Sequence, residues 1–132
     1  MGRIEKLTLY SLILLLIWGN MVSGLGAGLA CPDWPLCFGS FFPEINFPIF
    51  MEHGHRVLGL FVTIFFAFFA KERLTFYKVI HKLIPIICSI LLAIQIVAGA
   101  LVVILQLETN ITTFHFGNAM VCLLYTSDAA DE

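Results

Sequence analysis

Apolar residues fill four long stretches of this 132-residue chain, and charged residues lie mostly between them. The first stretch, 7–30, has no charged residue in 24 positions, which as a helix is about 36 Å long and enough to cross a bilayer. The stretches 47–70 and 83–107 are of similar length, and a fourth begins near Thr112. The pattern predicts an all-α membrane protein, a four-helix transmembrane bundle.

The segments between these stretches differ in composition. Residues 31–46 contain three prolines and a glycine, which predicts a loop or a half-buried lid. Residues 71–82 carry four basic residues against one acidic residue, and a short loop with this excess is usually cytoplasmic. Since Arg3 and Lys6 are also basic, we expect residues 1–6 in the cytoplasm and the 31–46 loop outside.

Composition supports the membrane interpretation. The chain is 60% hydrophobic and 12% charged, whereas a soluble domain carries about 25% charged residues. A cleaved signal peptide also starts with basic residues, but its apolar core is usually about 7–15 residues, so a first span is favoured. The net charge of −2 and the absence of a basic patch argue against nucleic acid as a partner; the lipid bilayer is the expected surrounding.

The fourth stretch is shorter than the others. Only 15 uncharged residues, 111–125, precede Asp128, Asp131 and Glu132. A carboxylate at the bilayer centre costs about 2.5–3.5 kcal/mol on insertion scales. We therefore expect a truncated fourth span, a membrane unit at 7–122, and a non-native tail at 123–132 of a fragment.

Four ionisable residues occupy five positions of the second stretch: Glu52, His53, His55 and Arg56. Glu52 and His55 are three residues apart, so they share one face of a helix. Ionisable side chains at membrane depth normally face a bundle interior, a cavity or a cofactor. The alternative is an interfacial end cap, with Arg56 extended toward the headgroups and the histidines in the headgroup layer.

His115 lies near the outer end of the fourth stretch, just as His55 lies near the outer end of the second. Alone, His115 would more often be an interfacial histidine. Paired with His55 at equal depth, it could ligate the iron of a haem held between helices, because imidazole suits iron and four-helix bundles build cofactor sites from facing side chains.

The cysteines fall into two groups. Cys31 and Cys37 bracket the proline-rich loop on the expected outer face, where disulfides persist. Two interpretations stay open for them, a disulfide that closes the loop and a redox-active pair near a reaction site. Cys88 and Cys122 lie in apolar stretches and are predicted to be inert core thiols.

Four segments, taken in order, resemble the N-terminal half of the haem A synthase family. They are CPDWPLCFG at 31–39, EHGHRVLGL at 52–60, QIVAGALVV at 95–103 and TTFHFGNA at 112–119. The cysteine loop followed by Glu-His-x-His-Arg is the specific part of this signal. The resemblance implies an eight-helix membrane enzyme of two similar halves, of which this chain would be the first.

The resemblance also implies an activity, oxidation of the C8 methyl of haem O to the formyl of haem A for terminal cytochrome oxidase. In that family each half supplies a histidine pair to a haem, with haem O in the N-terminal half and a haem b cofactor in the C-terminal half. By position, His55 and His115 would be the axial ligands here. Glu52 would be the catalytic acid beside the substrate, and Cys31 and Cys37 would be the family's outer-face pair.

Other features follow from the same resemblance. Arg56 and His53 would bind a haem propionate or support the ligands from behind, since guanidinium matches carboxylate. The setting would be a bacterial-type cytoplasmic membrane, with haem O synthase and cytochrome oxidase assembly factors as partners and a homo-oligomer left open. Two other function classes also remain, a bis-histidine membrane cytochrome and a small transporter or assembly subunit that relays protons.

Overall fold

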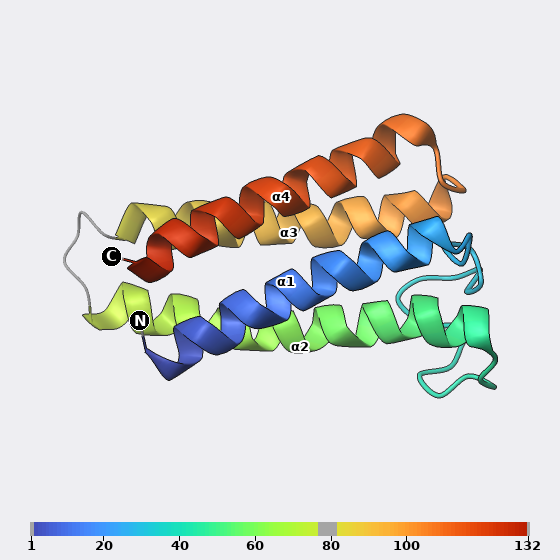
Figure 1. Cartoon of the computed structure of the whole chain (residues 1–132), viewed down its shortest axis with the longest axis horizontal. Helices are drawn as coiled ribbons and strands as arrows, with labels where there is room; N and C mark the ends of the chain where they lie inside the picture. Colours follow the sequence, from blue (N-terminus) through green and yellow to red (C-terminus); the bar gives the residue numbers. More distant parts are fainter. Residues whose placement is uncertain (1, 77–81, 132) are drawn as a thin grey trace.

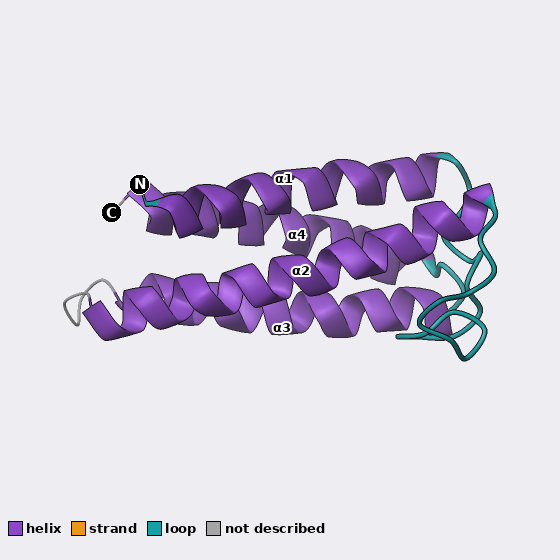
Figure 2. Cartoon of the chain, turned by 90° about the horizontal axis from the view of Figure 1, so that it is seen from below, coloured by secondary structure: helices purple, strands orange, loops and turns teal. Residues whose placement is uncertain are grey.

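The computed structural model describes residues 2–76 and 82–131, and these residues form four α-helices and no named strand. The helices are α1 (Arg3–Gly24), α2 (Phe47–Phe76), α3 (Leu83–Ile104) and α4 (Thr109–Asp131). They run alternately up and down, so that the start of α1 and the end of α4 lie at one end of the bundle, while the 25–46 loop and the 105–108 turn lie at the other (Figures 1 and 2). We call the first the inner end and the second the outer end, as names for the two ends of the bundle, and we call residues 25–46 the outer loop. The predicted all-α four-helix fold is confirmed.

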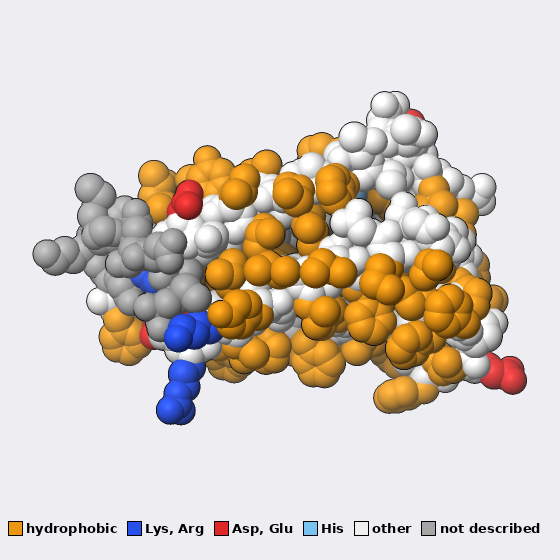
Figure 3. Space-filling view, viewed as in Figure 1, with side chains coloured by type: hydrophobic (Ala, Val, Ile, Leu, Met, Phe, Trp, Pro, Cys, Tyr) orange, Lys and Arg blue, Asp and Glu red, His pale blue; other side chains and the backbone are white. Residues whose placement is uncertain are grey.

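The surface of the bundle is that of a membrane protein. Among the described residues, α1 and α3 are long and apolar enough to cross a membrane. Hydrophobic side chains cover the bundle along the face shown in Figure 3, and Lys and Arg side chains gather at the end where α2 finishes. Soluble monomers rarely expose contiguous apolar patches larger than a few hundred Å², so lipid is the fitting solvent.

Two helices end earlier than their apolar stretches. Helix α1 stops at Gly24 rather than near residue 30, because Gly26 adopts a φ of 65° and its amide bonds back to the carbonyl of Ser23. Helix α3 stops at Ile104, before two residues with φ of 52° and 63°, Gln106 and Leu107. Hydrophobicity continues past both points, so these two helices are shorter than the apolar stretches 7–30 and 83–107.

The other two helices begin close to the expected positions and run further. Helix α2 starts at Phe47 and continues past residue 70 to Phe76, so the first part of the expected basic loop is helical. Lys78 and His81 of that loop lie outside the described residues. Helix α4 is preceded by Glu108, whose carboxylate accepts the Ile111 N–H at 2.9 Å, and it continues through 123–131. The Ile111 amide lowers the pKa of Glu108 below its ordinary value.

Each helix packs mainly on two neighbours: α1 on α2 and α4, and α3 on α4 and α2. Helices α2 and α4 therefore stand at opposite corners and run in the same direction (Figure 1). A buried apolar cluster joins α2, α3 and α4 toward the end of the bundle where α2 finishes, and it includes the free thiols Cys88 and Cys122, which were predicted to lie in the core. Its members are Phe66, Phe69, Ala70, Cys88, Leu92 and Cys122.

The inner ends of α1 and α2 are joined by an ion pair that the sequence pattern did not predict. Arg73 was counted among the exposed basic loop residues, but it lies in α2, is 3% exposed and donates to the Glu5 carboxylate at 2.6 Å. Its guanidinium also lies 5.7 Å from the centre of the Phe69 ring. Losing one partner of a buried pair typically costs about 3–5 kcal/mol, so this pair holds α1 against α2.

Candidate functional site

The outer loop is closed by a disulfide between Cys31 and Cys37, whose Cα atoms lie 4.8 Å apart and whose side chains are fully buried. Beyond it, Cys37 and Ser40 exchange two backbone hydrogen bonds of 3.1 Å. The carboxylate of Asp33 accepts the N–H groups of Gly39 and Phe38 at 2.7 Å each. Chiefly through Gly39, these amides hold the pKa of Asp33 below its ordinary value and fix the turn.

Arg56 attaches this loop to α2. Its guanidinium donates to the backbone carbonyls of Asp33 at 2.6 Å, Leu36, and Cys31 at 3.3 Å, and it forms an ion pair with Glu52. The Arg56 side chain is only 10% exposed. The end-cap alternative, in which Arg56 extends into the headgroups, is wrong because the guanidinium is enclosed by the loop backbone.

Glu52 lies between the loop and the helix. It is 4% exposed, and one carboxylate oxygen accepts the Cys31 N–H at 2.7 Å while the other pairs with Arg56. A buried carboxylate needs such partners, because transfer of an unpaired charge from water is very costly. The arrangement connects the disulfide loop directly to the only buried acid on this end of α2 among the described residues.

The His53 side chain lies on the face of α2 that contacts the 31–46 loop. Its Nε2 donates to the Phe41 carbonyl at 2.9 Å, since a carbonyl can only accept. A ring nitrogen of His53 and the two sulfurs of Cys31 and Cys37 all lie within 4.8 Å of one another. The two sulfurs are bonded to each other in the disulfide. The His53 ring therefore packs beside the disulfide and supports the loop that it closes.

His55 packs against α1 at a position where α1 has no side chain. A Cβ added to Gly19 would lie 2.9 Å from Cε1 of His55, which real contacts do not allow. One turn away, the indole N–H of Trp18 donates to the Met51 carbonyl at 2.9 Å, and the same indole packs over Gly54. The His55 ring is thus held in the α1–α2 interface.

His115 sits in the equivalent place between α3 and α4. A Cβ added to Gly99 would lie 3.2 Å from Cε1 of its ring, and the Gln95 amide nitrogen lies 3.3 Å from its Nε2. Gly19 and Gly99 both stand five residues before the last residue of their helices. Each helix pair therefore holds one half-buried imidazole against a glycine near its outer end.

The two histidines lie at similar depth. At 1.5 Å per residue, His55 is about 12 Å from the start of α2 and His115 about 9 Å from the start of α4. The two helices stand at opposite corners of the bundle, and each ring packs against a glycine of a neighbouring helix, His55 on α1 and His115 on α3. Both Nδ1 atoms are buried and have no hydrogen-bond partner among the described residues.

Sequence reasoning gave no role to the groups that support these rings. Gln95, Gly99 and Asn118 lie in the segments 95–103 and 112–119 that carry the resemblance, and Gly19 lies outside them. None of the four gives a periodic signal, because a glycine or an amide in an apolar helix has many uses. The one available hint was the presence of polar amides inside otherwise apolar stretches, where each must find a partner.

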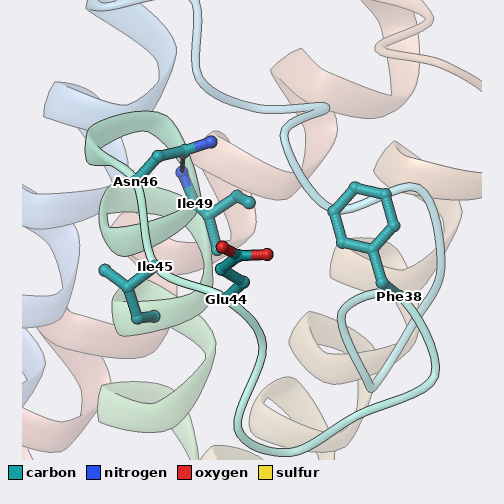
Figure 4. A pocket seen from close by; sticks show the side chains of 5 residues that line it. All are labelled: Phe38, Glu44, Ile45, Asn46 and Ile49. Carbon is teal, nitrogen blue, oxygen red and sulfur yellow. Dashed lines mark hydrogen bonds between the residues drawn. The ribbon is translucent and has the colours of Figure 1, made fainter.

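Two pockets lie elsewhere. One, of about 430 Å³, is formed by the loop and the start of α2, with Phe38 facing Glu44, Ile45, Asn46 and Ile49 (Figure 4). There the Asn46 side chain accepts the Ile49 N–H at 3.0 Å and caps the helix. The other, of about 330 Å³, lies between α3 and α4 and is lined entirely by apolar residues. None of the candidate residues lines either pocket.

Comparison with known proteins finds relatives among the haem A synthases. No protein-family model and no solved structure matches the chain. It is 34% identical over 116 residues to the haem A synthase of Geobacillus kaustophilus, 32% over 115 to that of Geobacillus thermodenitrificans and 29% over 122 to that of Bacillus pumilus. These alignments cover 86%, 86% and 89% of this chain but 36%, 36% and 40% of the relatives. The chain thus spans about two fifths of the length of the curated relatives it matches.

Proposed function

Because the chain belongs to the haem A synthase family, we propose that it is part of a membrane oxidoreductase that oxidises the C8 methyl of haem O to the formyl of haem A. The observation that carries the proposal is the pair of half-buried imidazoles, His55 and His115, at similar depth on opposite corners of the bundle. A bound haem would be held by these two side chains.

The residues present fit a haem. Imidazole nitrogen is a common donor to haem iron, and among the described residues the buried Nδ1 of each ring has no hydrogen-bond partner. Glycines at the two contact points let each ring lie close to the neighbouring helix. We propose His55 and His115 as the residues that hold the substrate haem O, and a haem b cofactor in the further half of the full-length protein.

Oxidation of an unactivated methyl group is beyond the reach of amino-acid side chains, so haem chemistry supplies the oxidising power. The chain's own residues bind the substrate, orient it and move protons. Glu52 is proposed to accept or deliver a proton at its carboxylate, because it is the buried acid one turn from His55. Arg56 and the Cys31 N–H hold that carboxylate in one position, and Arg56 keeps the loop closed over it.

The setting of the proposed enzyme follows from its substrate. Haem O is apolar and remains in the bilayer, so the enzyme that makes it, a haem O synthase, and the factors that load cytochrome oxidase are the fitting neighbours. The disulfide loop is proposed to face the outer side and the N-terminus the cytoplasm, in agreement with the basic residues at the opposite end of the bundle (Figure 3).

The proposed haem site is tested by replacing its ligands. In the full-length protein, His55→Ala and His115→Ala are each expected to lower haem content and change the haem absorption spectrum, because one side of the iron loses its donor. Asn20→Leu is the matched control and is expected to leave the haem spectrum unchanged, since the Asn20 amide donates to the Leu16 carbonyl of its own helix. Spectra of purified protein that stay unchanged in both alanine variants would refute the site.

The proposed orientation is tested with single cysteines at the two ends of the bundle. Phe42 is 93% exposed in the outer loop, and Glu72 is exposed near the end of α2. In intact spheroplasts, a membrane-impermeant maleimide is expected to label Phe42→Cys, and to label Glu72→Cys only after permeabilisation. The reverse pattern would show that the basic end lies outside.

A further inference from the structure

A run of exposed apolar side chains lies in the second half of the outer loop. Phe38, Phe41, Phe42 and Ile45 are 64%, 68%, 93% and 61% exposed. Residues 38–46 contain one charged side chain, that of Glu44. Isolated exposed hydrophobic residues are ordinary on a protein surface, but a contiguous apolar patch usually marks contact with an apolar partner. The segment 38–46 is therefore a candidate contact surface.

This segment does not project beyond the helices but folds back along α2. The Phe41 carbonyl accepts from Nε2 of His53, and the Arg56 guanidinium reaches two further carbonyls of the same loop. His53 lies six residues, about 9 Å, beyond the first residue of α2. Because helical side chains lean toward the N-terminus of their helix, Phe41 lies beside the first turns of α2. Figure 1 shows the loop passing beside this end of the helix.

Exposed carboxylates indicate where this end of the bundle meets water. Glu44 lies three residues before α2, and Glu108 lies directly before α4. Both are exposed, and a charged side chain is costly within the hydrocarbon of a bilayer. The headgroup layer, which is about 5–8 Å thick, therefore begins near the starts of α2 and α4. Phe41, beside the first turns of α2, lies within that layer and close to the acyl chains.

The face of α2 beside the loop is apolar along its length. Exposed apolar residues recur on it at helical spacing, namely Phe47, Phe50, Val57, Phe61, Ile64 and Phe68. This stripe lies about a third of a turn from the face of Glu52, His53 and Arg56 that holds the loop. Hydrophobic side chains extend to the outer end of the bundle in Figure 3. The loop therefore flanks the stripe, and lipid that contacts the stripe also reaches the loop.

We propose that residues 38–46 are a lipid-binding anchor, whose phenylalanine side chains insert among phospholipids at the boundary between headgroups and acyl chains. Interfacial segments bind membranes in this way, by burying apolar side chains at that boundary. The inference does not depend on the proposed reaction, and it holds whichever end of the bundle faces the cytoplasm. The loop backbone stays in the hydrated headgroup layer, so a short cysteine side chain at residue 42 remains accessible to aqueous reagents.

Nitroxide spin labels test where these side chains lie. Full-length protein is labelled at Phe42→Cys and placed in nanodiscs of phosphatidylcholine and phosphatidylglycerol, and wild-type protein treated identically gives the background from native cysteines. Molecular oxygen concentrates among acyl chains, whereas a nickel chelate stays in water. We expect the ratio of oxygen to nickel accessibility to be several-fold higher at residue 42 than at the matched control Glu44→Cys, two residues away.

Two results would overturn the proposal. Equal ratios at residues 42 and 44, with nickel reaching both labels, would show that the patch lies in water. A label at residue 42 that neither reagent reaches would show that a protein surface covers the patch instead of lipid. Phe41→Cys provides a second position with the same expected ratio, in case the first variant does not fold. A label at Phe61→Cys, in the stripe of α2, gives the ratio of a side chain in contact with acyl chains.

Discussion

Replacing Glu52 with Gln is expected to leave haem bound to the full-length protein while lowering haem A formation about 10²–10⁴-fold, the usual contribution of a general acid or base. The amide has nearly the same shape as the carboxylate, and its oxygen can still accept from the Cys31 N–H or from Arg56. What is lost is the ability to take up and release a proton. The haem composition of membranes from a strain without its own synthase measures this result.

Glu44→Gln is the matched control for that experiment. Glu44 is an exposed carboxylate in the same outer loop, and its replacement is expected to leave haem A formation unchanged. If Glu52 were only a structural partner of Arg56, Glu52→Gln would reduce the amount of haem-loaded protein but not the conversion per bound haem. Full haem A production by Glu52→Gln would leave Glu52 with no catalytic role.

Replacing Arg56 with Met is expected to destabilise the outer end of the bundle by about 3–5 kcal/mol, the usual cost of removing one member of a buried ion pair. The Glu52 carboxylate would stay buried without its counter-charge, and the carbonyls of Asp33, Leu36 and Cys31 would lose their shared donor. The rate of proteolysis within the 31–46 loop, measured in detergent, is expected to rise accordingly. Lys71→Met, which removes an exposed cation from the same helix, is expected to leave it unchanged.

A double variant separates the cost of an unpaired buried charge from the cost of losing the Arg56 contacts to the loop. Glu52→Gln together with Arg56→Met removes both charges, so part of the lost stability is expected to return, because a lone buried charge costs more than a missing pair. Proteolysis that is equally slow in the wild type and in Arg56→Met would show that the loop does not depend on the Arg56 contacts.

The four helices could be predicted because the chain divides into four apolar stretches, three of them 24 or 25 residues long, separated by segments rich in proline or charge. Their ends were harder to predict. The backbone turns into the left-handed region at Gly26 and again at Gln106 and Leu107, while most neighbouring residues remain apolar, so hydropathy gives little sign of the change. The resemblance to a known family could be recognised because the cysteine loop and the Glu-His-x-His-Arg segment are each contiguous in the sequence. The relatives found by comparison confirm it.

The contacts of the candidate residues could not be predicted, because they join positions far apart in the chain. Arg56 was identified as a functional candidate, yet its partners Asp33, Leu36 and Cys31 lie 20–25 residues earlier, and no pattern in the loop marks them as acceptors. Arg73 was assigned to a surface loop because its neighbours are charged, whereas its partner Glu5 is 68 residues away.

The attachment of the outer loop has a consequence for how freely its sequence can vary. Arg56 binds carbonyl oxygens, and Glu52 binds an N–H, so the helix recognises the path of the loop backbone and not the identity of its side chains. The exposed side chains of Phe41 and Phe42 take no part in this attachment. Substitutions at these positions can therefore remodel the face that the protein presents to lipid or to a neighbouring protein without disturbing the buried carboxylate beneath it.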